Sequence, residues 1–308
     1  MKISKDRARG LSAAFGAHII WGVLVLYWKL IDDLPPLDII CYRILWTPVF
    51  MLLLLLVIGK WRGVFFSEIK GLLHNPSQAA RLFAASLLIS VNWLTYLFAV
   101  NNNHVAEASL GYFINPLLNF VLSLAFLHER LSRLGAAACG FALAGVIVAG
   151  VQTGAVPWIS LTLAATFSVY GLIKVRIKLH SYTGLMLETL LVLPLALVYL
   201  LAFAERGFMS YSAGENALVF GAGIATAVPL LLFAEAVPRI SYISVGFIQY
   251  ISPTITFFFS VFLFKEPTSP MKLFGFCLIW IGILIFGFDS IRAARGRSVP
   301  ARAEDREG

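Results

Sequence analysis

Charged side chains are scarce in this chain. Of its 308 residues only 13% are charged, whereas 59% are hydrophobic and 14% are aromatic. A soluble globular domain carries about 25% charged residues. Apolar runs of about 20 residues recur, and that length crosses a hydrocarbon core about 30 Å thick. The composition therefore excludes a water-soluble enzyme or a DNA-binding protein and predicts an all-α polytopic membrane protein.

Cysteine is also rare, and familiar catalytic motifs are missing. Cys41, Cys139 and Cys277 stand alone in apolar runs, with neither a CxxC pair nor a Cys/His spacing suited to zinc. The sequence has no GxxxxGK[ST] loop and no HExxH pair. We therefore expect no catalytic residues, no metal site and no cofactor. A lipid-modifying membrane enzyme is disfavoured, and any driving energy would come from the solute gradient or coupled ions.

The net charge of +8 follows topology rather than a binding patch. If the N-terminus is cytoplasmic, all 24 lysines and arginines fall on the inner side except Lys29, Arg43, Arg206, Lys265 and Lys272. Cytoplasmic loops of membrane proteins carry such an excess of basic residues. The pattern predicts a multi-pass inner-membrane protein with both termini cytoplasmic. Its basic segments would contact membrane lipid, not nucleic acid.

Ten apolar stretches are long enough to cross a membrane. They predict transmembrane helices at 10–30, 37–58, 81–101, 104–127, 133–151, 155–173, 183–204, 216–236, 240–264 and 271–289. No small-residue cleavage site follows the first stretch, so we expect a retained helix rather than a signal peptide. Connections are short except 59–80 and 205–215, and the Arg-rich segment 291–308 is expected to be a disordered tail.

An internal repeat relates the two halves of the chain. Residues 116–151 align with 253–288 without a gap, at an offset of 137, with seven identities. Each segment ends a half of five predicted spans, 10–151 or 155–289. Because five is odd, the halves enter the membrane in opposite directions, a plan that many secondary transporters share. The predicted fold is therefore ten transmembrane helices in two inverted five-helix repeats.

Short sequences spread over the chain resemble a known family. They include Asn92-Trp-Leu-Thr-Tyr-Leu-Phe, Glu107-Ala-Ser-Leu-Gly-Tyr-Phe-Ile-Asn-Pro-Leu, Ile20-Trp-Gly, Leu187-Glu-Thr and Phe247-Ile-Gln-Tyr-Ile-Ser-Pro. Over residues 10–290 the sequence is similar to the RarD proteins, a branch of the EamA family in the drug/metabolite transporter superfamily. The resemblance implies an inner-membrane permease with two EamA repeats. RarD proteins are labelled chloramphenicol-sensitivity or resistance permeases. His128-Glu129-Arg130 departs from the Gly-Glu-Arg of many relatives.

Two ionisable residues fall inside predicted spans, where a charge costs about 2.5–3.5 kcal/mol on insertion scales. Arg43 lies in the second span and Glu188 in the seventh, and they enter the membrane from opposite sides. We therefore expect local partners rather than a direct pair: Glu107 for Arg43, and Lys174 or Arg176 for Glu188. Such pairs would act as gates on the two sides, and Arg43 would alternatively bind an anionic group. Otherwise they fix helix packing, or Arg43 reaches the outer interface.

Polar and aromatic side chains form a second candidate group. They are His18, Trp21, Asn92, Trp93, Tyr112, Asn115, Asn119, Gln249 and Tyr250. Amides offer donors and acceptors without the full cost of a charge, and rings offer surfaces for flat ligands or cations. With Arg43 and Glu188, we predict that this set lines a central substrate-binding cavity. The alternative is hydrogen bonding and aromatic packing between helices.

Two prolines occupy matching positions in the repeat. Pro116 and Pro253 each remove a backbone donor inside a predicted span and would kink it. We predict that these kinks serve as gating hinges; the alternative is that they only shape the helices.

The leading hypothesis from sequence is a secondary-active carrier, not an enzyme. It would move a small organic solute or drug, such as an amino-acid-like metabolite or chloramphenicol, by alternating access around a midplane cavity. Its partners would be that solute and membrane lipid, and a monomer would suffice. The alternatives are a lipid flippase and a non-transporting membrane sensor or assembly factor.

Overall fold

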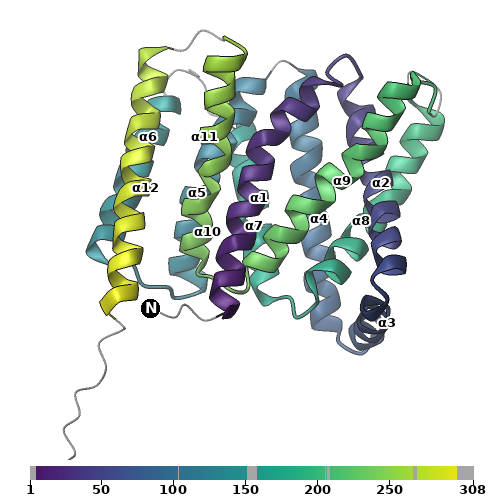
Figure 1. The fold of residues 1–308 in the computed structure, drawn as a ribbon, viewed down its shortest axis with the longest axis horizontal. Helices are drawn as coiled ribbons and strands as arrows, with labels where there is room; N and C mark the ends of the chain where they lie inside the picture. The colour runs from purple at the N-terminus through teal and green to yellow at the C-terminus, as the bar shows by residue number, and fades with distance from the viewer. Residues whose placement is uncertain are drawn as a thin grey trace, which may run out of the picture.

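A computed structural model describes residues 5–102, 104–150, 158–204, 206, 209–265 and 269–296. Over these ranges every regular element is helical, and the helices form one bundle (Figure 1). Their bounds are α1 (Lys5–Lys29), α2 (Pro36–Val57), α3 (Gly59–Leu73), α4 (Pro76–Asn101), α5 (Val105–Phe126), α6 (Arg133–Gly150), α7 (Trp158–Arg176), α8 (Ser181–Ala202), α9 (Ala213–Ala236), α10 (Tyr242–Gln249), α11 (Ile251–Phe258), the π-helical turn η2 (Phe259–Leu263) and α12 (Pro270–Gly296).

Every range predicted to cross the membrane overlaps one of these helices. Within the described residues, seven helical stretches are long and apolar enough to span a bilayer, and α5 and α6 contain shorter apolar stretches. The structure is therefore that of a multi-pass, all-helical membrane protein.

The connection 59–80 contains a helix that the sequence analysis did not predict. In α3, Trp61, Phe65 and Ile69 recur every fourth residue and so share one face. The Trp61 ring lies 5.0 Å from that of Tyr182 in α8, and Phe65 is buried. The polar residues Arg62, Ser67 and Lys70 are exposed, so α3 is amphipathic and lies against the end of the bundle rather than crossing it.

The ninth predicted span is broken in the middle. Helix α10 ends at Gln249, Tyr250 forms a turn, and α11 begins at Ile251. Pro253 accounts for the break because it has no N–H to donate to the carbonyl of Gln249. Helix α5 stays continuous through Pro116, so the two matched prolines do not produce matching backbones.

Helix packing is reciprocal between the first and last five predicted spans. Helices α1 and α2 pack on α9, just as α7 and α8 pack on α4, and α6 packs on α12. A Cβ added to Gly145 in α6 would lie 2.6 Å from the Gly275 carbonyl oxygen in α12. A Cβ added to Gly282 in α12 would lie 2.7 Å from the Ala138 carbonyl oxygen in α6. Both residues of one contact are offset by 137 from those of the other, so the contact recurs with the segments exchanged.

The first described helix begins and the last ends at the same end of the bundle (Figure 1). We call this the basal end, and the opposite one the distal end. Helix α12 continues through Ile291 to Gly296, so the first residues of the predicted disordered tail are helical instead. Asp289 in this helix accepts a 2.5 Å hydrogen bond from Ser132, which ties the last turns of α12 to the start of α6. Residues 297–308 lie outside the described part of the chain.

Candidate substrate cavity and its closure

Arg43 lies in the distal half of the bundle, two turns into α2. Its Nε donates a 2.8 Å hydrogen bond to Thr226 Oγ1 of α9. Its guanidinium carbon lies 4.7 Å from the centroid of the Trp28 ring of α1, a cation–π contact. Among the described residues, none accepts a hydrogen bond from Nη1 or Nη2, and no carboxylate forms an ion pair with Arg43.

Two tyrosines complete this group. Tyr96 of α4 and Tyr112 of α5 lie near Arg43, and their ring centroids are 6.5 Å apart. Tyr112 is 52% exposed, and Arg43, Trp28 and Tyr96 are partly exposed. The Arg43 cluster, as we call it, draws on five helices: Arg43, Trp28, Tyr96 and Tyr112 are accessible, and Thr226 is buried.

An aromatic cluster lies towards the basal end from the Arg43 cluster. The Trp21 ring is 5.0 Å from His18, 6.0 Å from Phe167 and 5.8 Å from Phe233. His18 and Phe233 are each 1% exposed, and His18 Nδ1 lies 3.3 Å from Ser252 Oγ. These rings fill the space between α1, α7 and α9, and we call them the aromatic plug. Trp93 packs nearby, partly buried between three hydrophobic clusters.

A buried ion pair adjoins the aromatic plug. Lys174 Nζ of α7 lies 2.7 Å from Glu188 Oε1 of α8, with side chains only 4% and 2% exposed. Tyr170, whose ring is 5.9 Å from Phe167, donates a 3.0 Å hydrogen bond to Glu188 Oε2. The expected local partner of Glu188 is therefore Lys174, while Arg176 bonds to the Phe126 carbonyl instead. Both carboxylate oxygens are satisfied, as a buried charge requires.

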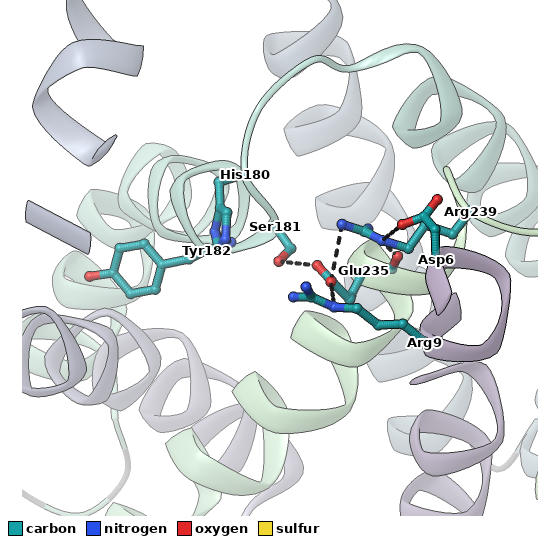
Figure 2. A network of polar contacts seen from close by, with 7 residues as sticks. All are labelled: Asp6, Arg9, His180, Ser181, Tyr182, Glu235 and Arg239. Atoms are coloured by element: carbon teal, nitrogen blue, oxygen red, sulfur yellow. Dashed lines mark hydrogen bonds and ion pairs between the residues drawn. The ribbon is translucent and has the colours of Figure 1, made fainter. Parts of the chain in front are cut away.

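A network of ion pairs and hydrogen bonds lies at the basal end of the bundle (Figure 2). Glu235, near the end of α9, lies 2.5 Å from Arg9 of α1 and 3.1 Å from Arg239, and accepts a 3.3 Å hydrogen bond from Ser181 at the start of α8. Arg239 also pairs with Asp6 of α1 at 3.1 Å. The arginine after the end of α9 complements the dipole of that helix and offsets the Glu235 carboxylate in its last turn. The network therefore joins α1, α8 and α9.

A second carboxylate caps a helix at this end. Glu129 accepts hydrogen bonds from the backbone N–H groups of Tyr242 at 2.7 Å and Ile243 at 3.1 Å, at the start of α10. The tyrosine hydroxyl in turn donates to the Ser168 carbonyl of α7 at 2.6 Å. The His128-Glu129-Arg130 turn thus holds α10 in place.

A buried carboxylate fastens the distal loop. Asp38 of α2 is fully buried and accepts hydrogen bonds from Tyr199 at 2.8 Å and from Tyr211. Burial and the hydrogen bond to Asp38 raise the pKa of Tyr211, so its hydroxyl remains a donor at neutral pH. The sequence analysis did not single out this group.

The predicted amides form hydrogen bonds between helices. Asn92 donates to the Leu163 carbonyl at 2.8 Å and to Thr166 at 2.9 Å, which joins α4 to α7. Asn115 accepts from Ser168 at 2.8 Å, and Asn119 donates to Gln249 at 2.8 Å inside the bundle. These contacts agree with the packing interpretation, while the shared substrate cavity stays a prediction.

Three further predicted residues have other surroundings. Tyr250 is fully buried and donates to the Phe113 carbonyl at 3.3 Å. The Pro116 carbonyl lies 3.1 Å from a Cβ placed on Gly246, where α5 and α10 approach closely. The side chain of Glu107, the expected partner of Arg43, lies outside the described part of the structure.

Several residues of the site were missed from sequence. Trp28 follows Trp21 by seven residues and Tyr96 follows Asn92 by four, so helical spacing would have indicated both. Thr226 gave no such signal, since threonines in apolar helices commonly bond their own backbone, as Thr226 does to Ala222 at 2.8 Å.

Known proteins match this chain over nearly its full length. A sequence profile described as the EamA-like transporter family matches residues 8–151 and again 156–288. The uncharacterized transporter YojE of Bacillus subtilis (strain 168) is 44% identical, over 94% of this chain and 97% of that one. Protein RarD of Escherichia coli (strain K12) is 38% identical, over 96% of this chain and 99% of that one.

A more distant relative and a solved structure also match most of this chain. A chloramphenicol-sensitive protein RarD of Pseudomonas aeruginosa is 27% identical, over 96% of this chain and 98% of that one. A chain in a solved crystal structure superposes with a TM-score of 0.71 at 19% identity, over 91% of this chain and 97% of that chain. At that identity the superposition supports the helical fold alone.

Proposed function

The chain belongs to the EamA-like transporter family, within its RarD branch, and on that premise we propose that it is a secondary-active carrier of small organic solutes. One observation carries the proposal: an accessible, cationic cluster lies distal to a bundle end at which charges are paired, one pair of them buried. A carrier in one state of alternating access has this asymmetry.

In this proposal the Arg43 cluster binds solute, and the contacts below it form the closed gate. The gate has two layers, the Lys174–Glu188 pair with the aromatic plug and the Glu235 network at the basal end. Opening it requires α1, α8 and α9 to separate. Pro253 and the break at Tyr250 supply a hinge in the span that packs on α1.

Orientation follows from the basic residues of the basal end. We assign this end, with both termini, to the cytoplasm, because Arg9, Lys174 and Arg239 belong to it and basic residues favour the cytoplasmic side. The Arg43 cluster then faces outward.

Two inverted repeats explain the reciprocal packing. We assign residues 10–151 and 155–289 to five-helix repeats, supported by the exchanged glycine contacts at Gly145 and Gly282. If each repeat adopted the conformation of the other, the distal end would close as the basal end opens.

The chemical identity of the solute is also a proposal. The names of relatives point to chloramphenicol, whereas the charge of Arg43 suits amino-acid-like metabolites. Energy would come from the solute gradient or from coupled ions.

Transport in proteoliposomes tests this function. Vesicles containing purified protein would be offered a labelled pool of amino acids, nucleosides and chloramphenicol, with and without a proton gradient. We expect uptake of at least one compound, and loss of that uptake in Arg43→Ala. Wild-type flux in that variant, or no flux in folded wild type, would contradict the proposal.

Lipid movement is a second candidate because of one surface groove. It opens between α4 and α8 and is lined by Leu72, Leu82, Phe83, Leu187, Leu190 and Leu191. An acyl chain fits such a surface, but this lining offers no polar path for a headgroup. Fluorescent-lipid scrambling at a rate above that of empty vesicles would favour this function over solute transport.

A further inference from the structure

The Arg43 guanidinium is incompletely satisfied, unlike the buried charged groups of Lys174, Glu188 and Asp38. Lys174, Glu188 and Asp38 all have charged or hydroxyl partners within the bundle. Arg43 uses Nε on Thr226 and one ring face on Trp28, which leaves both amino groups without a described protein acceptor. Arginine is not deprotonated in proteins, so Arg43 keeps a positive charge that an anionic ligand can neutralise.

The free edge of that guanidinium has a defined geometry. Contact with Trp28 fixes the plane, and the bond to Thr226 fixes the rotation within it. The two remaining amino groups, with four N–H donors, form a fork that matches the two oxygens of a carboxylate. A single ammonium would not impose this match.

The two tyrosines beside Arg43 also favour an anionic ligand. Within the described residues, neither the Tyr96 nor the Tyr112 hydroxyl bonds to protein, so both can donate to an anion. Their rings and that of Trp28 offer apolar surface for the rest of the molecule.

We infer that the Arg43 cluster is a carboxylate-recognition site, and that the carried solutes are small organic monoanions or zwitterions with a flat or apolar body. This deepens the proposed carrier function and rests on it. Neutral compounds of the same shape, including chloramphenicol, are then poor ligands of this site.

A matched set of ligands tests the inference at the level of binding. Phenylacetate, phenylacetamide and 2-phenylethylamine share a ring and differ mainly in charge. Equilibrium binding of labelled phenylacetate to protein in lipid nanodiscs, with the other two and chloramphenicol as competitors, measures the preference without requiring transport. We expect phenylacetate to bind roughly 10- to 100-fold more tightly than phenylacetamide, the usual gain for a charge-assisted pair.

Variants assign that preference to the cluster. Arg43→Gln should abolish the difference between anion and amide, and Arg43→Lys should restore only part of it. Tyr112→Phe, which keeps the ring and removes the hydroxyl, should weaken anion binding a few-fold. Tyr112→Phe still tests the inference if Arg43→Gln does not fold.

Each outcome has a clear meaning. Equal binding of the anion and the amide, no saturable phenylacetate binding at millimolar concentration, or an unchanged preference in folded Arg43→Gln would overturn the inference. Flux of neutral solutes without anion preference would reject the inference and leave the carrier standing. Anion preference in binding without any flux would support the carboxylate site and reject the carrier function.

Discussion

The basal carboxylates and the distal Arg43 differ in how far the protein satisfies their charge. At the basal end, Glu188 has an ammonium and a hydroxyl as partners, and Glu235 has two guanidinium groups and a hydroxyl. At the distal end, Arg43 has an indole face and one hydroxyl, with part of its guanidinium unsatisfied. Charges paired within the protein hold helices together, whereas a charge left incomplete is available to a ligand.

Burial follows the same division. Glu188, Lys174, His18 and Phe233 are all 5% exposed or less, while Tyr112 is 52% exposed. The Lys174–Glu188 pair and the aromatic plug are therefore dry, and removing one partner of the pair leaves an uncompensated group in a medium that cannot solvate it. The distal group is accessible, so its groups can be changed with little damage to the fold.

The largest expected effect comes from breaking the buried pair. Glu188→Ala leaves Lys174 and Tyr170 without their acceptor and should destabilise the protein by about 3–5 kcal/mol. Thermal unfolding in detergent measures the loss. The double variant Lys174→Met/Glu188→Leu, which removes both charges, should recover most of it; equal destabilisation of the single and double variants would contradict a paired role.

A smaller effect is expected where the distal cluster holds its guanidinium. Trp28→Leu removes the cation–π contact, worth about 0.5–2 kcal/mol, and lets Arg43 rotate. Solute affinity should fall roughly two- to thirty-fold while the folded fraction is unchanged. Trp158→Leu on the bundle surface is the matched control, since that indole is 52% exposed and contacts Phe98 rather than Arg43.

A weaker effect is expected at the basal network. Glu235→Gln removes the ion pairs with Arg9 and Arg239, and partly exposed pairs contribute about 0.2–1 kcal/mol each. That energy shifts a two-state equilibrium a few-fold towards opening. A cysteine placed at Ser181 should react a few-fold faster with a reagent on the basal side; unchanged reactivity would show that the network does not hold this end closed.

The smallest effect is expected for the stability of an Arg43 variant. Arg43→Gln loses one hydrogen bond and the cation–π contact with Trp28 but also removes an unneutralised charge, so these contributions oppose each other. The free energy of unfolding should stay within about 0.5 kcal/mol of wild type. A loss comparable to that of Glu188→Ala would mean that Arg43 is a packing residue, and would erase the difference between the two ends.

The sequence predicted those features that follow from local composition. Charges in apolar runs are conspicuous, so Arg43 and Glu188 were found. Depth along their helices argued against a direct pair and indicated Lys174 or Arg176 for Glu188, of which the structure pairs Lys174. Helix α3 was missed because its apolar positions recur on one face without forming a long apolar run. Trp28 and Tyr96 were missed although helical spacing placed them beside chosen residues.

Other features depend on contacts that no local pattern specifies. Asp6 and Arg239 are 233 positions apart, and Asn119 and Gln249 are 130 apart. An amide in an apolar span is compatible with a ligand site or with a bond to the next helix, and only the packing of α5 on α10 decides for Asn119. The different backbones at Pro116 and Pro253 likewise depend on their neighbours rather than on the shared proline.

Side-specific labelling tests the central claim most directly. In a cysteine-free background reconstituted with known orientation, a single cysteine at Tyr112 would be exposed to a membrane-impermeant thiol reagent on one side at a time. The account predicts modification from the outer side and little from the cytoplasmic side, with protection by a transported solute. Modification chiefly from the cytoplasmic side, or no protection by any transported solute, would contradict an outward-facing binding site at the Arg43 cluster.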